Sequence, residues 1–221
     1  MKTFEVTRAS FRAALRGSCR PTIEGIDNFP DAGPVIVAPN HLSFLDSIII
    51  QAMMPRKVAF FAKAEYFTAR GPKGAAMRWF FSSVGSIPVE RGEQAASVAA
   101  LQSAVDVLGR NEAFGIYPEG TRSRDGKLYR GRTGVGWLAL TTGAPVLPVG
   151  LIGTEQLQPA GKMMVRPKHF TVRIGKPLYF ERTGPQHSLP ARRSATDQIM
   201  DAIADLTGQD RSHSYNKTPS E

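Results

Sequence analysis

The feature of this sequence that most constrains its fold is a series of short apolar runs, each bounded by glycine, proline or a charged residue. Runs of this length suit strands, and their nearly continuous apolar character is typical of strands buried on both faces of a parallel sheet. We therefore predict strands at six places: 34–38, 58–62, 86–89, 113–117, 146–151 and 170–174.

Helical patterns lie between these runs, with apolar residues recurring at the spacing of one helix face. They cover four stretches: 42–53, 93–109, 134–142 and 199–206. Strands that alternate with helices predict an α/β fold, with a mixed, largely parallel sheet flanked by helices. At 221 residues the chain has room for one large domain or two small ones. We predict a single domain.

The two ends of the chain differ in composition from its centre. Residues 1–20 combine arginines with Phe4, Phe11 and Leu15, which predicts a basic, weakly amphipathic helix. Such a helix either lies on an anionic membrane or packs on its own domain. Residues 21–207 are expected to form the folded domain, and the polar residues 208–221 a flexible tail.

One uncharged stretch, 133–154, is long enough to cross a bilayer. It contains glycines and prolines that would break a single helix: Gly134, Gly136, Gly143, Pro145, Pro148, Gly150 and Gly153. A helix, a turn and a strand fit this pattern better. We predict no transmembrane helix, and the first twenty residues contain no apolar run of the kind found in secretory signals.

The charge balance of the chain is strongly basic. It has 28 Lys and Arg against 19 Asp and Glu, which gives a formal net charge of +9. This surplus favours an anionic partner, such as an acidic membrane, a phosphorylated substrate or nucleic acid, although it also suits simple solubility. No nucleic-acid recognition motif is present, so we expect no nucleic-acid partner. The single cysteine, Cys19, excludes a disulfide framework and a cysteine-based zinc site.

A histidine and an aspartate follow the first predicted strand, at His41 and Asp46. Residues five apart do not share one side of an ideal helix. The two side chains can meet if His41 lies in the turn after the strand and Asp46 in the first turn of the helix. The carboxylate would then fix the imidazole tautomer and make the other ring nitrogen a general base. The alternative is a histidine that merely caps the helix.

The sequence indicates where the nucleophile would come from. It has no Gly-x-Ser-x-Gly turn, and Cys19 lies in the basic N-terminal stretch. We therefore expect a base at His41 to deprotonate a hydroxyl of the substrate. No metal is expected, because no second histidine lies near His41 in the sequence.

A second cluster, Glu119–Ser123, directly follows another predicted strand. Gly120 allows close approach of the backbone, Thr121 and Ser123 supply hydroxyls, and Arg122 offers a planar group suited to phosphate oxygens. Glu119 either orients Arg122 or the attacked group, or serves as a salt-bridge partner. Arg91, at the end of a different predicted strand, could meet the same anion. Further cationic candidates, which could equally be solvated surface charges, are Lys63, Arg130 and Arg132.

Four blocks of the sequence resemble those of the glycerolipid acyltransferases. They are NHLSFLD at 40–46, SIPVERG at 86–92, YPEGTRS at 117–123 and VLPVG at 146–150. They occur in the order of that family, and the compact size is similar to that of bacterial 1-acyl-sn-glycerol-3-phosphate acyltransferases. Two features depart from the family pattern: Pro88 and Glu90 precede Arg91, and no two-helix membrane anchor is evident.

The resemblance implies the glycerolipid acyltransferase fold and specific roles for residues. His41 would be the base, oriented by Asp46. The residues that it assigns to the glycerol phosphate of the acceptor are Lys63, Arg91, Glu119, Gly120, Thr121, Arg122 and Ser123. An apolar groove for the acyl chain could include residues for which core packing is the alternative: Leu42, Phe44, Phe60, Phe61 and Pro148.

The resemblance also implies an activity and partners. The expected reaction transfers a fatty acyl group from acyl-CoA or acyl carrier protein to a hydroxyl of lysophosphatidic acid, without a covalent acyl-enzyme, cofactor or metal. Glycerol 3-phosphate or another lysophospholipid is the alternative acceptor, and a non-catalytic lipid-binding protein is the alternative function. The expected location is the cytoplasmic face of the cell membrane, as a peripheral or monotopic protein on an anionic surface.

Overall fold

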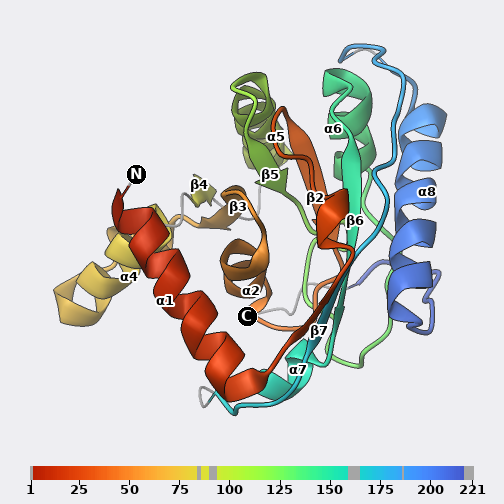
Figure 1. The fold of residues 1–221 in the computed structure, drawn as a ribbon. Coiled ribbons are helices and arrows are strands. Elements are labelled where there is room, and N and C mark those ends of the chain that lie inside the picture. Colours follow the sequence, from red (N-terminus) through yellow and green to blue (C-terminus); the bar gives the residue numbers. More distant parts are fainter. Residues whose placement is uncertain (1, 84–85, 90–93, 159–164, 186, 217–221) are drawn as a thin grey trace.

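The structure is a computed structural model and describes residues 2–83, 86–89, 94–158, 165–185 and 187–216 (Figure 1). Within these residues, seven strands form one sheet in the order β1-β7-β6-β2-β5-β3-β4. Strand β6 pairs antiparallel with β7, whereas the other pairs are parallel. The strands are β1 (Thr22–Glu24), β2 (Val35–Pro39), β3 (Val58–Lys63), β4 (Ile87–Val89), β5 (Ala113–Gly115), β6 (Val146–Ile152) and β7 (Thr171–Ile174).

Helices cover both faces of this sheet (Figure 1). They are α1 (Lys2–Cys19), α2 (Asp46–Met53), α3 (Glu65–Thr68), α4 (Gly71–Ser83), α5 (Gln94–Gly109), α6 (Gly134–Thr142), α7 (Thr154–Leu157) and α8 (Leu189–Thr207), with a 3₁₀ helix at Ile26–Asn28. The expected single α/β domain with a mixed, largely parallel sheet is confirmed.

Strand β2 shows why its sequence is apolar at every position. Val35 and Val37 belong to the core shared with α2, whereas Ile36 and Ala38 belong to the core shared with α5, α6 and α8. Successive side chains of a strand point to opposite faces, and both faces here are covered by helices. The strand therefore lies at the centre of the molecule, and its C-terminal end leads into the predicted His–Asp motif.

The six predicted strands are present with small shifts at their ends, but some elements were not predicted. Strand β1 is only three residues long and partly exposed, and helices α3 and α7 are single turns, so their patterns are weak. Pro88, which departs from the family pattern, lies in the edge strand β4. A proline is tolerated there because it lacks only a donor that an edge strand can leave unused.

The predicted helix at 42–53 begins later than expected, at Asp46. Residues 133–154 include the whole of α6, a short connection and the whole of β6, as predicted. Among the described residues, none of the helices has both the length and the apolar character needed to cross a membrane.

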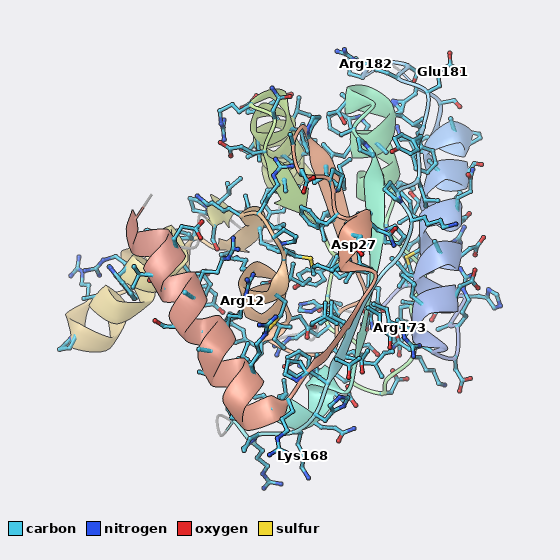
Figure 2. All side chains as sticks on the ribbon, viewed as in Figure 1. Arg12, Asp27, Lys168, Arg173, Glu181 and Arg182 are labelled. Atoms are coloured by element: carbon cyan, nitrogen blue, oxygen red, sulfur yellow. The ribbon has the colours of Figure 1, made fainter. Side chains whose placement is uncertain are left out.

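The N-terminal helix α1 contacts α2 through an arginine. The Arg12 guanidinium donates to the carbonyl oxygens of Ala52, Met53 and Met54, at 2.7, 3.4 and 3.0 Å. Figure 2 shows the Arg12 side chain between the two helices. Of the two readings of this helix, packing on its own domain is therefore present, and contact with a membrane stays a prediction.

The end of the described chain differs from the flexible tail that we expected. Leu128 forms an isolated parallel β-bridge with Arg211. Its amide donates to the Asp210 carbonyl at 2.9 Å, and its carbonyl accepts from the Ser212 amide at 2.8 Å. Residues 209–216 thus have defined backbone partners, which hydrophobic periodicity could not reveal because the segment is polar.

Candidate active site

The C-terminal end of β2 is fixed by a buried asparagine. Asn40 is 0% exposed, and its side-chain amide pairs with the backbone of Leu151 in both directions. Its Nδ2 donates to the Leu151 carbonyl at 2.9 Å, and its Oδ1 accepts from the Leu151 amide at 2.7 Å. Because buried polar groups are costly to leave unpaired, this exchange holds the end of β2 against β6. His41 is the next residue.

His41 and Asp46 are joined by a hydrogen bond of 2.9 Å between Nδ1 and Oδ2. The same Oδ2 accepts from the amides of Leu42 and Ser43, at 2.7 and 2.8 Å, so the carboxylate also shapes the turn before α2. The Asp46 side chain is fully buried and that of His41 is 16% exposed. This is the predicted arrangement of a histidine in the turn and an aspartate in the first helical turn. With Nδ1 occupied, Nε2 is the nitrogen that can take a proton.

The face of the imidazole packs on Tyr117, the first residue of the YPEGTRS motif, for which no separate role was predicted. The rings of His41 and Tyr117 stack with centroids 3.8 Å apart. The Tyr117 hydroxyl shares a hydrogen bond with Ser47 Oγ at 2.7 Å, and Phe60 stacks on its ring at 5.4 Å. Burial, with a smaller contribution from the Asp46 charge, raises the pKa of Tyr117 well above its ordinary value. Tyr117 therefore stacks on the imidazole of His41 as a neutral phenol.

Glu119 has a different position from the one expected. It is 1% exposed, and its two carboxylate oxygens accept from backbone amides: Oε1 from His41 at 3.0 Å and Oε2 from Tyr129 at 2.9 Å. Burial raises the pKa of Glu119 to about 7, although both amides act in the opposite direction. We had expected Glu119 to contact the acceptor, Arg122 or a salt-bridge partner. In the structure the carboxylate links the backbone of His41 to that of Tyr129, and its contact with the acceptor stays a prediction.

The loop after Glu119 is tied to His41 at a second point, since the Ser123 amide donates to the His41 carbonyl at 2.8 Å. Ser123 is itself buried and donates through Oγ to Asp125, and its contact with the acceptor stays a prediction. Gly120 has φ of +77°, and a Cβ there would lie 2.8 Å from the Arg132 side chain. Arg132 therefore lies directly against this turn, and the left-handed backbone at Gly120 favours glycine.

The other predicted phosphate contacts are only partly described. Arg122 is exposed and Thr121 half-buried, both in the loop that is tied to His41. Lys63 ends strand β3, but its side chain lies outside the described part of the structure, as does the whole of Arg91. The structure thus brings the loop with Arg122 next to the His–Asp pair. The proposed contacts of Lys63 and Arg91 stay predictions.

The predicted groove residues do not lie together. Phe44 is 39% exposed and meets the edge of Tyr66, and Leu42 beside it is half-buried. Phe60 belongs to the buried core, and Pro148 is buried in β6, where it pairs with Ala38. Phe61 packs against Phe114, at 4.7 Å between ring centroids. Core packing, the alternative stated for each, therefore describes these last three residues better than a groove.

The described residues contain no group of three or more His, Cys, Asp or Glu side chains that could hold a metal ion. What they do contain is a buried carboxylate paired with a partly exposed imidazole, beside a loop that carries an exposed arginine. This arrangement can accept a proton at Nε2 while an anionic group is held nearby.

Comparison with known proteins adds to this geometry. The acyltransferase family model matches residues 20–152. A chloroplastic 1-acyl-sn-glycerol-3-phosphate acyltransferase of Brassica napus is 31% identical over 160 residues, which are 71% of this chain and 44% of that protein. The protein of that name from Borreliella burgdorferi is 29% identical over 154 residues, which are 69% of this chain and 60% of that protein.

A solved structure has a similar fold. The crystal structure of the 1-acyl-sn-glycerophosphate acyltransferase PlsC from Thermotoga maritima matches with a TM-score of 0.71 and 26% identity. It covers 92% of this chain, which in turn covers 79% of that one. This chain spans about half the length of the curated plant and algal relatives that it matches. The family match extends over more than half of the chain and includes the His–Asp pair and the Gly120–Arg122 turn, so the chain belongs to the acyltransferase family.

Proposed function

We propose that this protein is a 1-acyl-sn-glycerol-3-phosphate O-acyltransferase. It transfers a fatty acyl group from a thioester, acyl-CoA or acyl carrier protein, to a hydroxyl of lysophosphatidic acid. The observation that carries the proposal is the buried His41–Asp46 pair, at 2.9 Å, joined through the His41 backbone to the loop that holds Arg122. The names of the relatives from Brassica and Borreliella support the choice of acceptor.

The mechanism follows from the position of the base. His41 Nε2 takes the proton of the acceptor hydroxyl while its oxygen adds to the thioester carbonyl, and Asp46 stabilises the imidazolium that forms. Collapse of the tetrahedral intermediate breaks the carbon–sulfur bond. The imidazolium gives its proton to the leaving thiolate, which restores the neutral base. Each turnover thus forms one ester and one free thiol, and no acyl group is attached to the protein.

Positioning supplies a second contribution. Arg122 binds the acceptor phosphate in this mechanism, with Arg91 and Lys63 as further cations. Holding the phosphate while the hydroxyl meets the base makes the encounter effectively intramolecular. The basic surplus of the chain, +9, suits this phosphate, the phosphates of the donor and an anionic membrane on whose cytoplasmic face the protein would work.

The experiment that tests this function mixes an acyl donor with an acceptor and measures the release of free thiol. The donor is acyl-CoA or acyl carrier protein loaded with a fatty acyl group, and the acceptor is lysophosphatidic acid or glycerol 3-phosphate. We expect release with lysophosphatidic acid, and loss of about 100-fold or more of kcat in His41→Ala. Turnover at the wild-type rate in His41→Ala would refute the base. If thiol is released with glycerol 3-phosphate and not with lysophosphatidic acid, the acceptor is glycerol 3-phosphate. If no combination of donor and acceptor releases thiol, a lipid-binding protein without catalysis is favoured.

The phosphate contact is tested by two arginines of the same loop. Arg122→Ala should raise the KM for lysophosphatidic acid by about tenfold or more and leave the donor KM near that of the wild type. Arg124→Ala, also exposed, is the matched control and should change neither constant. If only the donor KM rises in Arg122→Ala, the assignment of Arg122 to the acceptor phosphate is wrong.

A further inference from the structure

Residues 209–216, which we call the C-terminal strap, run beside the loop that carries Arg122. Three backbone hydrogen bonds join the two segments. Leu128 donates to Asp210 at 2.9 Å and accepts from Ser212 at 2.8 Å, and Arg130 donates to Ser214 at 3.0 Å. The loop from Gly120 to Arg132 has no helix and only an isolated bridge. The strap therefore supplies three of the hydrogen bonds that hold this loop, beside those to His41, Glu119 and Pro118.

One side chain of the strap joins this loop to the base. Gln209 Oε1 accepts from Asn40 Nδ2 at 2.8 Å, and Gln209 Nε2 donates to the Gly126 carbonyl at 2.6 Å. Asn40 is fully buried and immediately precedes His41. Both ends of the Gln209 amide are thus used, one on the segment that carries the base and the other on the loop.

The far end of the strap contacts the loop again, near the arginine assigned to the phosphate. Asn216 Nδ2 donates to the Arg122 carbonyl at 3.0 Å. The guanidinium groups of Arg130 and Arg132 lie over the Tyr215 ring, at 5.3 and 5.7 Å from its centroid. Arg132 is also the side chain against Gly120. The strap therefore contacts the loop at both of its ends.

We propose that the C-terminal strap belongs to the acceptor-binding site, and that Gln209 is a positioning residue that sets the separation between His41 and the loop with Arg122. This inference rests on the proposed function. The acceptor must reach the base with its hydroxyl and the loop with its phosphate at the same time. Small displacements between such groups are costly, since a shift of about 1 Å can lower the rate by about 100-fold. In the proposed mechanism the acceptor phosphate, and not the acyl donor, contacts the loop with Arg122, so the acceptor is the substrate whose binding this separation affects.

The test replaces Gln209 with methionine, which has a similar length and lacks both the donor and the acceptor. We expect Gln209→Met to raise the KM for lysophosphatidic acid by about tenfold, with the donor KM within about twofold of the wild type. The matched control is Gln198→Met on the exposed side of α8, where the amide contacts only Ser194 of the same helix among its described partners. It should behave as the wild type.

Two kinetic results would overturn the inference. One is an unchanged acceptor KM in Gln209→Met. The other is a rise of both KM values by the same factor together with a lower unfolding temperature, which would indicate a general loss of structure. Preservation of the unfolding temperature alongside the selective rise in acceptor KM supports a positioning role.

Hydrogen exchange separates this inference from the proposed function. If the wild type transfers an acyl group to neither acceptor, the proposed function fails, but the strap can still be tested by its effect on the loop. Faster exchange of the Leu128 and Arg130 amides and of residues 120–123 in Gln209→Met, and not in Gln198→Met, would support the strap as the element that holds the loop. Equal exchange in the two variants would overturn it.

Discussion

At the scale of single residues, His41 is fixed by four contacts, two of its backbone and two of its imidazole ring. Its amide donates to Glu119, its carbonyl accepts from Ser123, its Nδ1 bonds to Asp46 and its ring stacks on Tyr117. In the proposed mechanism, a base fixed in this way needs little rearrangement when the substrate arrives, which is the usual requirement for efficient proton transfer. The buried carboxylate of Glu119 is the most unusual of these contacts, because its backbone partners are uncharged.

Glu119 makes the stability of the protein depend on pH. Its pKa of about 7 in the folded chain exceeds the ordinary value of 4.5, so the protonated form favours folding. This contribution is complete below about pH 4.5 and is lost as the pH rises through about 7. Between pH 5 and 8, the free energy of unfolding of the wild type should therefore fall relative to Glu119→Gln, by at most about 1.4 kcal/mol per pH unit.

Urea unfolding at several pH values checks this expectation. Glu112→Gln is the matched control, since Glu112 is exposed and pairs with Arg110 at the surface. Its difference from the wild type should stay nearly constant over the same range. A constant difference for Glu119→Gln as well would contradict a raised pKa at this carboxyl.

The residue contacts mark the limit of what the sequence could predict. The spacing of His41 and Asp46 allowed their pairing to be predicted, with a capping histidine as the alternative, because the turn after β2 leads directly into α2. The hydrogen bond from His41 to Glu119 joins residues 78 positions apart and exists because β2 and β5 are neighbours. Nothing in the local pattern distinguishes Glu119 as an acceptor of two amides from Glu119 as a ligand for the substrate.

At the scale of elements, α2 links the candidate active site to the N-terminal helix. It begins at Asp46, which bonds to His41, and its last residues present carbonyl oxygens to Arg12 of α1. The carbonyls at a helix C-terminus lack partners within the helix and carry partial negative charge, so a guanidinium there is favourable. Arg12 therefore contributes to the packing of α1 on α2.

Replacing Arg12 with methionine tests this contact. The variant keeps most of the apolar stem and removes the hydrogen bonds to Ala52, Met53 and Met54. We expect a loss of about 1 to 2 kcal/mol in the free energy of unfolding, measured by urea denaturation. Arg16→Met, at an exposed position of the same helix, should lose little. Equal losses in the two variants would show that the carbonyl contacts contribute no stability.

Strands and helices could be predicted from the sequence where burial produces a strong pattern of apolar residues. Strands β2, β5 and β6 are buried at successive positions because helices cover both faces, and they were predicted, as were β3, β7 and the edge strand β4. Elements near the edge of the sheet were harder to predict from the sequence. Strand β1 is half exposed, and α4 mixes glycine, proline and charged residues with its apolar ones, so neither has a clear period.

At the scale of the whole molecule, the net charge of +9 is the property most relevant to where the protein acts. Electrostatic attraction of cationic side chains to anionic lipids adds up over a surface and weakens with salt. We expect the protein to cosediment with vesicles of phosphatidylcholine containing an anionic lipid, and much less with phosphatidylcholine alone. Raising the salt concentration to about 0.5 M should release it. Equal binding to both vesicles, or binding that salt does not change, would contradict an electrostatic contact.

The pairing of Asn40 also bears on how the protein is made. This residue bonds to Leu151 and Gln209, which follow it by 111 and 169 positions. On the ribosome, the first of these partners appears only after β6 has been synthesised, and the second only when nearly the whole described chain has emerged. The segment that carries the histidine therefore cannot reach its final geometry early in translation, and a nascent chain that has not yet reached Gln209 would hold an incomplete candidate active site.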